Sequence, residues 1–199
     1  MYIICSDLEG VFVPEVWINV AERTGIEELR MTTRDEPDYD KLMNQRIRIL
    51  DQHGLKLKDI QDVIATIKPL EGALDFLWWV RKKTQAIVVS DTFSQFADPL
   101  MAQLDRPTIF CHNLIVDESD RIVGYKLRQP DPKKKVVQAL QSLEYKVIAF
   151  GDSYNDTSML LQADIGILFC PPDNVIADFP QLTVCTTYKE LMDKLEPYI

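Results

Sequence analysis

The sequence lacks the features of membrane-spanning, secreted and nucleic-acid-binding proteins. No apolar run approaches the ~18–20 residues that a membrane-spanning helix needs. Acidic residues at positions 7 and 9 come too early for the apolar segment of a signal peptide. Only 22 Lys and Arg residues stand against 31 Asp and Glu, so there is no excess of cations to neutralise nucleic-acid phosphates. We therefore expect no membrane segment and no nucleic-acid partner.

Cysteine is also sparse. The chain has four cysteines, and no two of them form a CxxC pair. This spacing argues against a cysteine–zinc cluster and against a disulfide framework. We expect reduced thiols that pack as small apolar residues, and a cytoplasmic location. The cysteines are Cys5, Cys111, Cys170 and Cys185.

The length of 199 residues, with 46% hydrophobic and 27% charged residues, is typical of one folded domain that carries a modest insertion. The net charge of −9 has a consequence for function. If the protein handles phosphate or carboxylate, a few cations must gather at one place against the overall negative field.

Short apolar runs that alternate with helical segments predict an α/β fold with a parallel sheet covered on both faces. The expected strands are Tyr2–Cys5, Ala86–Val89, Val147–Phe150 and Ile165–Phe169. The expected helices include Leu70–Lys82, Phe93–Leu104, Pro132–Leu143 and Tyr154–Ala163. Polar residues follow the first three strands, and open α/β sheets bind ligands at the carboxyl ends of their strands.

Residues 15–68 interrupt this alternation with three helical patterns and no strand pattern. The patterns are Val16–Thr24, Tyr39–His53 and Leu57–Ile67, separated by Gly25, Pro37 and Gly54. We expect residues 1–14 and 69–199 to form the core, and residues 15–68 to form a small helical cap. Later in the chain, Leu114–Leu127 predicts a hairpin with a turn at Asp117–Asp120, and Tyr188–Tyr198 predicts a closing helix.

The pattern of residues 39–53 places one arginine on the apolar side of its helix. With Met43 set at ~0° and successive residues at ~100°, Arg46 falls at ~300°, inside the apolar arc, and Arg48 falls on the opposite face. A buried guanidinium keeps its proton and needs an anionic partner. Two interpretations stay open. Arg46 binds an anionic ligand, or it has a structural role, in which it extends to solvent at the edge of the core or pairs with a structural carboxylate.

Two carboxylates, Asp7 and Glu9, follow the first expected strand. In an extended segment residues two apart share a face, so both side chains can approach one reacting atom. One carboxylate can then act as nucleophile or metal ligand while the other transfers protons. An ordinary turn is the alternative interpretation of this pair.

Two further positions combine a helix start with groups that suit phosphate. Ser90 follows the second expected strand, in Ser90–Thr92, where hydroxyls and N–H groups can hold phosphate or only cap the helix. Lys133 lies at the start of a helix, where a cation opposes the helix dipole. A locally unfavourable residue marks a candidate functional position, although a solvated basic run is the alternative, and it covers Lys134 and Lys135.

The segment Gly151–Asp156 follows the third expected strand. Acids at a helix start suit the dipole and hydroxyls cap the helix, so Asp156 and Ser153 need no functional explanation. Asp152, at the strand end, lies where a carboxylate ligand of a hard cation would lie. Magnesium takes few carboxylates, keeps waters and binds substrate phosphate.

The order of these signals is Asp-x-Glu, Ser, Lys and Gly-Asp-x-x-x-Asp, each near a strand end or a helix start. In this order the sequence resembles the haloacid dehalogenase superfamily over nearly its whole length. The helical insertion resembles the cap of the phosphoserine phosphatase branch. A set of stretches resembles the subfamily of that branch that transfers phosphate from phosphoserine to homoserine: DLEGVFVPEVW, TTRDEPDYD, QRIRILD, IKPLEGA, SDTF and GDSYNDT.

The resemblance implies a three-layer Rossmann-like core, a Mg²⁺ cofactor and roles for the acids. Asp7 would be the nucleophile that takes the phosphoryl group. Glu9 would be the general acid and base, and its backbone carbonyl would bind the metal. Asp152 would be the other carboxylate ligand beside Asp7, with Asp156 in support.

The resemblance also implies how a substrate is held. Phosphoserine would be the phosphoryl donor, and water or homoserine the acceptor. Glu15 would bind the substrate ammonium and Arg46 its carboxylate. The phosphoryl end would be bound by Ser90, Lys133 and Asn155, and Asp91 would be a further substrate-binding residue. The oligomeric state stays open, with a homodimer as one option.

One residue departs from the wider superfamily, whose phosphatases usually carry Asp at the position of Glu9. Glutamate is one methylene longer, so its proton is presented from a shifted position. The phosphotransferase subfamily carries Glu there.

Two alternatives to phosphoserine turnover remain at this stage. One is a phosphatase for another small phosphate ester. Glu15 and Arg46 argue against this alternative, because they provide one charge for each charged end of an amino acid. The other is a receiver-type module that accepts phosphate on aspartate as a switch and does not turn over.

Overall fold

A seven-stranded sheet forms the centre of the molecule. The computed structural model describes residues 1–32, 35–36 and 38–199. The strand order is β4-β3-β2-β1-β5-β6-β7, and the pairings are parallel except for β3 with β4. The strands are β1 (Tyr2–Ser6), β2 (Gln85–Phe93), β3 (Thr108–Val116), β4 (Ile122–Lys126), β5 (Lys146–Gly151), β6 (Ile165–Phe169) and β7 (Thr183–Cys185).

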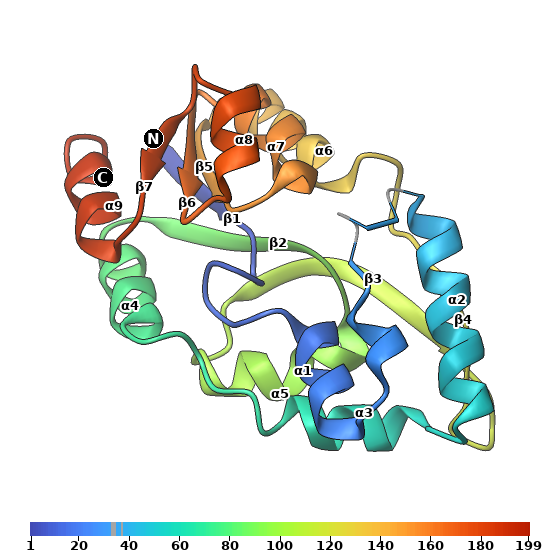
Figure 1. Ribbon diagram of the computed structural model, residues 1–199. Coiled ribbons are helices and arrows are strands. Elements are labelled where there is room, and N and C mark those ends of the chain that lie inside the picture. Colours follow the sequence, from blue (N-terminus) through green and yellow to red (C-terminus); the bar gives the residue numbers. More distant parts are fainter. Residues whose placement is uncertain (33–34, 37) are drawn as a thin grey trace.

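Helices cover both faces of this sheet and give the three layers expected from the sequence (Figure 1). On one face α6 (Pro132–Ser142) and α7 (Thr157–Gln162) pack against β2, β5 and β6, with α8 (Asp173–Asp178) beside them. On the other face lie α4 (Ala73–Lys83), α5 (Ser94–Gln103) and α9 (Tyr188–Leu195). The α/β prediction is therefore confirmed.

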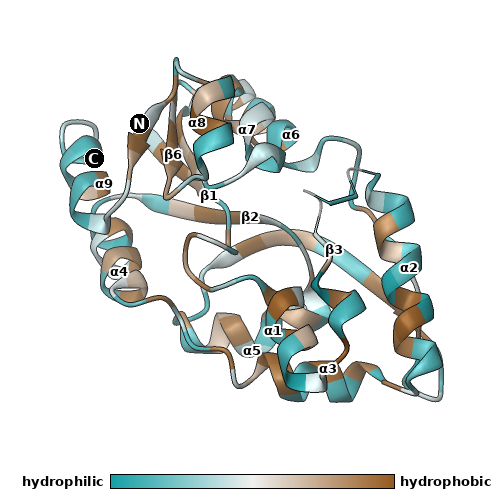
Figure 2. Ribbon diagram, in the orientation of Figure 1, coloured by the Kyte–Doolittle hydropathy of each residue, from teal (hydrophilic) through white to brown (hydrophobic). Residues whose placement is uncertain are grey.

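Alternating side chains of the strands supply two apolar cores. In β1, Ile4 packs into the larger core, while Ile3 and Cys5 point into the core under α6 and α7. Successive side chains of a strand point to opposite faces of the sheet, and a parallel sheet between two helical layers needs apolar side chains on both faces. In Figure 2 the middle of β2 is brown, whereas the surface helices alternate between brown and teal.

The order of the strands determines where a site can form. β1 is central, and the chain continues to β2 on one side and later to β5 on the other. Ligands bind at such a switch point, outside the carboxyl ends of the strands. Asp7 is the first residue after β1, and its N–H donates to the carbonyl of Phe150 in β5 at 3.0 Å.

The described residues between 15 and 68 contain helices and no strand. They form α1 (Val16–Thr24), the 3₁₀ helix η1 (Glu27–Arg30), α2 (Tyr39–Gln52) and α3 (Leu57–Ile64). Gly25 ends α1 in the left-handed region at φ 71°, and the Asp38 carboxylate caps α2 by accepting the Lys41 N–H. Pro37, expected to separate two helices, lies outside the described residues. The division into a core and a cap stays a prediction.

The hairpin of β3 and β4 contacts these helices. The Asp120 carbonyl in its turn accepts the N–H of Leu57 at 2.9 Å, and the Asp120 carboxylate accepts the N–H of Lys58 at 3.0 Å. Arg121 pairs with Asp51 near the end of α2. The hairpin therefore fixes the junction of α2 and α3 relative to the sheet.

Some expected boundaries were wrong. β2 continues past Val89 to Phe93, and its register with β3 shifts in between, so the polar residues 90–92 belong to an irregular end of the strand. α3 ends at Ile64 instead of Ile67, because β-branched residues and Pro69 follow. The four cysteines are free, as expected. None of the helices in the described ranges has the length and apolar character that crossing a membrane requires.

Candidate active site

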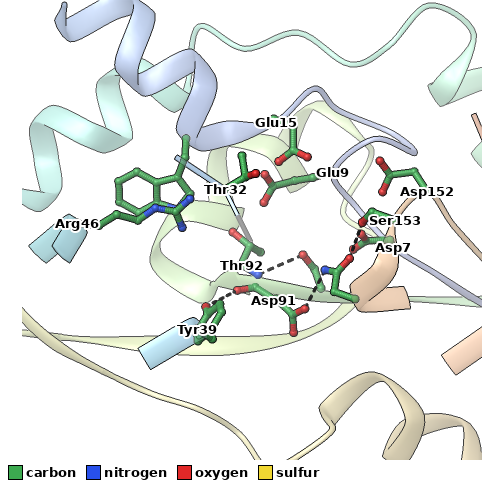
Figure 3. A pocket seen from close by; sticks show the side chains of 13 residues that line it. Asp7, Glu9, Glu15, Thr32, Tyr39, Arg46, Asp91, Thr92, Asp152 and Ser153 are labelled. Atoms are coloured by element: carbon green, nitrogen blue, oxygen red, sulfur yellow. Dashed lines mark hydrogen bonds between the residues drawn. The ribbon is translucent and has the colours of Figure 1, made fainter. Parts of the chain in front are cut away.

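A cavity of about 90 Å³ lies where the ends of β1, β2 and β5 meet α1 and α2 (Figure 3). Eight residues that the sequence singled out line it, so one cavity collects groups from positions 7 to 155. They are Asp7, Glu9, Glu15, Arg46, Ser90, Asp91, Asp152 and Asn155. Lys133 and Asp156 lie behind the cavity wall, 2% and 0% exposed.

Asp7 and Lys133 form a buried ion pair. Lys133 Nζ lies 3.0 Å from Asp7 Oδ1, and the same oxygen accepts the Leu8 N–H at 2.7 Å. Burial and the neighbouring Asp156 raise the pKa of Asp7, and the Lys133 ammonium opposes this rise. Both of these contacts are made by Oδ1, so they leave the other oxygen of Asp7, Oδ2, available.

Lys133 is held by three carboxylates. Its ammonium lies 2.7 Å from Asp156 Oδ1 and 3.7 Å from Asp91 Oδ2, in addition to Asp7. Burial acts to lower the pKa of Lys133, but Asp156 and Asp7 raise it well above its usual value. The lysine is therefore a permanent cation, and these acids offset its unfavourable place at the start of α6.

The Glu9 carboxylate is turned toward the first helix of the segment 15–68. Its Oε2 accepts the N–H of Val16, at the start of α1, at 2.8 Å. Burial and the neighbouring Glu15 raise the pKa of Glu9 to about 8. A carboxyl group with this pKa carries its proton near neutral pH, which suits a general acid.

Three buried acids form a cluster that can hold a metal ion. Carboxylate oxygens of Asp7, Asp152 and Asp156 lie within 4.8 Å of one another. Both Asp156 oxygens already accept hydrogen bonds, one from Lys133 and the other from the N–H groups of Asp152 and Ser153. The carboxylates of Asp7 and Asp152 are hard anionic donors and fit a hard divalent cation.

The position of Asp152 depends on a glycine in the loop after β1. Gly10 has a φ of 73°, and a Cβ there would lie 2.5 Å from the Asp152 carboxylate carbon. Any larger residue would displace this carboxylate and strain the backbone. The pKa of Asp152 is raised to about 7, mainly by burial and secondly by the charge of Asp156. A bound cation would favour the ionised form.

Asp91 accepts hydrogen bonds and does not itself suit an anion. Asn155 Nδ2 donates to Asp91 Oδ2 at 3.1 Å, and Tyr39 Oη donates to the Asp91 carbonyl at 3.1 Å (Figure 3). Burial acts to raise its pKa, yet Lys133 and His112 hold the pKa of Asp91 at about 2. The adjacent Ser90 Oγ accepts the Thr92 N–H at 3.2 Å.

Arg46 points inward, as the helix pattern predicted, and is 7% exposed. Its guanidinium carbon lies 4.4 Å from the ring centroid of Trp17, and Nη2 donates to the Met31 carbonyl at 2.7 Å. Burial lowers the pKa of Arg46 to about 10, so it stays charged. Its buried Nε has no partner among the described residues. The arginine is thus fixed and has capacity for an anion.

The cavity wall also contains Trp17, Thr32 and Tyr39, which sequence reasoning missed. Thr92 and Ser153 line it as well, although the sequence had explained both as residues of a helix start. Trp17 and Tyr39 belong to apolar helix faces, where a core position is the default expectation. No local pattern distinguishes a ring that packs in the core from one that shapes a cavity.

The site joins two halves of different chemistry. At the ends of β1, β2 and β5, the Asp7 carboxylate, a fixed cation and a cluster of acids that can hold a metal ion suit a phosphoryl group. Toward α1 and α2, Glu15 and Arg46 offer opposite charges. Glu9 lies between the two halves (Figure 3).

Comparisons with known proteins agree with this arrangement. Residues 6–164 match the family described as haloacid dehalogenase-like hydrolase. "Phosphoserine phosphatase" of Pseudomonas syringae pv. tomato is 62% identical over 95% of this chain and 80% of its own. "Phosphoserine phosphatase ThrH" of Pseudomonas aeruginosa is 61% identical over 96% of this chain and 93% of its own.

Solved structures share the fold. A crystal structure of phosphoserine phosphatase in apo form superimposes with a TM-score of 0.78 at 20% identity, and covers 99% of this chain and 98% of that one. A phospho-aspartyl intermediate analogue of phosphoserine phosphatase gives 0.75 at 19% identity over 96% and 97% of the two chains. With the match over residues 6–164 and relatives above 60% identity, the chain belongs to the haloacid dehalogenase-like hydrolase family.

Proposed function

We propose that this enzyme transfers the phosphoryl group of phosphoserine to Asp7, and then to water or to homoserine, with Mg²⁺ as cofactor. One observation carries the proposal: a single cavity has Asp7, paired with the buried Lys133, at one end, and Glu15 with Arg46 at the other. The names of the two Pseudomonas relatives support phosphoserine as the substrate. A receiver-type switch would not need Glu15 and Arg46 at the far end of this cavity.

In the first half-reaction, Asp7 Oδ2 attacks phosphorus and the bond from phosphorus to the serine oxygen breaks. Glu9 gives its proton to that oxygen, and serine leaves. The product is an aspartyl-phosphate on Asp7. Lys133, Ser90 and Asn155 hold the phosphoryl oxygens, and Asp91 holds two of these donors in place.

In the second half-reaction, Glu9 takes the proton of the acceptor hydroxyl while the acceptor oxygen attacks phosphorus. The bond to Asp7 breaks and the carboxylate is restored. Water as acceptor gives phosphate, and homoserine gives phosphohomoserine. Glu15 and Arg46 would bind the ammonium and carboxylate of homoserine as they bind those of phosphoserine, so one cavity can serve both amino acids.

The metal site would be formed by the Asp7 and Asp152 carboxylates and the Glu9 backbone carbonyl, with Asp156 supporting Asp152. When bound, Mg²⁺ offsets the repulsion between the Asp7 carboxylate and an anionic phosphate. We expect EDTA to abolish phosphate release, and Mg²⁺ in excess over EDTA to restore it. Full activity in EDTA, after dialysis against the chelator, would contradict a metal-dependent reaction.

The carboxylate role of Arg46 predicts a substrate-specific defect. Arg46→Ala should raise KM for phosphoserine at least ~30-fold, because losing one partner of a buried charge pair costs about 2–5 kcal/mol. The KM for an aryl phosphate, which has no carboxylate, should change little. Steady-state kinetics on both substrates checks this, with Arg48→Ala, on the exposed face of α2, as the matched control. Equal defects on the two substrates would refute the assignment.

The acceptor is tested by competition. The enzyme is incubated with phosphoserine and increasing homoserine, and serine, free phosphate and phosphohomoserine are measured together. If one aspartyl-phosphate serves both acceptors, phosphohomoserine should rise as free phosphate falls, and their sum should equal the serine released. Constant free phosphate without phosphohomoserine would leave water as the acceptor and refute transfer.

Two wider predictions accompany this function. The helices of residues 15–68 would act as a cap that excludes bulk water from the aspartyl-phosphate, over a core of residues 1–14 and 69–199. The free cysteines support the expected cytoplasmic location.

A further inference from the structure

His112 is a buried polar residue that no part of the proposed chemistry uses. It lies in β3, is 2% exposed, and does not line the active-site cavity. Two aromatic rings flank it, with centroids 6.4 Å (Tyr39) and 6.3 Å (Phe93) from that of His112, and Tyr125 packs against both of these rings. An apolar ring would fill such a place equally well, so the two ring nitrogens need an explanation.

Each nitrogen of His112 has a partner on a different segment. Nδ1 accepts the backbone N–H of Arg128 at 3.1 Å, and Nε2 lies 3.4 Å from Asp91 Oδ1. An accepting Nδ1 carries no proton, so the proton of the neutral ring is on Nε2 and faces the Asp91 carboxylate. The backbone bond thus selects the tautomer that can support Asp91.

These two partners lead to the phosphoryl end of the site. Arg128 lies in the segment between β4 and α6, five residues before Lys133. Asp91 Oδ2 lies 3.7 Å from Lys133 Nζ and accepts Asn155 Nδ2 at 3.1 Å. His112 therefore connects the chain that leads to Lys133 with the carboxylate that Lys133 and Asn155 contact.

We propose that His112 is a positioning residue for the phosphoryl-binding groups: by joining the Arg128 backbone to Asp91, it fixes Lys133 and Asn155 relative to Asp7. Its nitrogens are already engaged by Arg128 and Asp91, and no step of the reaction requires it to transfer a proton. The inference rests on the proposed function only in taking Lys133 and Asn155 as phosphate-binding groups. Residues that orient metal ligands contribute about 10–100-fold in affinity or activity, and we expect a similar factor for a residue that orients phosphate-binding groups.

The test compares two substitutions of His112. His112→Phe keeps the ring volume among the aromatic neighbours and removes both nitrogens. His112→Gln keeps a donor at about the place of Nε2. We expect kcat/KM of His112→Phe to fall ~10–100-fold, by the same factor on phosphoserine and on an aryl phosphate, and His112→Gln to recover most of it.

Two controls separate positioning from stability. Leu114→Ala removes a buried side chain from the same strand, so it should lower the melting temperature and leave kcat/KM unchanged. In an Asp91→Asn background, His112→Phe should cost much less than in the wild type, because the two residues act as a unit. This double-mutant cycle also tests the proposal if His112→Phe is less stable.

Several outcomes would overturn the inference. They are wild-type kcat/KM in His112→Phe, no recovery in His112→Gln, a loss confined to phosphoserine, or additive effects with Asp91→Asn. Binding of inorganic phosphate, measured by calorimetry, should weaken in parallel with kcat/KM. If the wild type failed to turn over phosphoserine, the proposed function would fall, whereas phosphate binding and aryl phosphate turnover would still test His112.

Discussion

Asp7→Asn is expected to reduce kcat for phosphoserine by at least ~10⁴-fold, since removing a nucleophile abolishes covalent catalysis. The amide keeps an oxygen that can accept the Leu8 N–H, so the loop after β1 should keep its conformation. Removing one negative charge from the cluster with Asp152 and Asp156 relieves repulsion, so the variant should fold. Rapid-quench kinetics with phosphoserine labelled in the phosphoryl group measures both turnover and covalent label.

The covalent label makes this prediction specific to Asp7. Wild-type enzyme quenched in acid should retain label on the protein, and Asp7→Asn should retain none. Asp193→Asn, which removes an exposed carboxylate from α9, is the matched control and should behave as wild type. Acid-stable label on Asp7→Asn, with residual turnover, would assign the nucleophile to another carboxylate of the cavity.

The sequence predicted where the site lies, because several of its candidate residues directly follow strands. The apolar runs before Asp7 and Asp152 are short and end at an acid or at Gly-Asp, and the structure has both strands where they were expected. Helix periodicity likewise predicted that Arg46 points inward. These inferences depend on local pattern alone, since strand ends and helix faces follow from spacing between neighbouring residues.

Other parts of the fold depend on contacts between distant segments. The strand β2 extends to Phe93 because Phe93 pairs with His112, 19 residues later in the chain. The polar residues Ser90–Thr92 had instead predicted an end at Val89. The short strand β7 (Thr183–Cys185) exists because β6 offers it an edge to pair with. Strands of this kind have too few residues for a reliable pattern of their own.

The charge environment of Lys133 also depends on distant segments, so the sequence could not predict it. The sequence indicated only that a cation at a helix start is locally unfavourable. The compensation comes from Asp7, Asp91 and Asp156, which belong to three other segments and become its neighbours only in the folded chain. The partners of His112 and the contact of Trp17 with Arg46 are equally remote in sequence.

Lys133→Met is expected to impair both activity and stability. The methionine fills much of the same volume but leaves three carboxylates without their cation. Breaking a buried charge pair by removing one partner costs about 3–5 kcal/mol, and losing a fixed cation at the phosphoryl oxygens costs at least ~10²-fold in kcat. Urea unfolding and steady-state kinetics with phosphoserine measure the two effects separately. Lys135→Met, two residues along α6 and exposed, should change neither.

A second substitution separates these two effects. In Lys133→Met/Asp156→Asn one of the uncompensated carboxylates becomes neutral, so part of the lost unfolding free energy should return. The amide can still accept the N–H groups of Asp152 and Ser153, which keeps the loop after β5 in place. Activity should not return, because no cation then opposes the phosphoryl charge beside Asp7. Recovery of kcat together with stability would mean that Lys133 serves the fold alone, and that another group neutralises the phosphate.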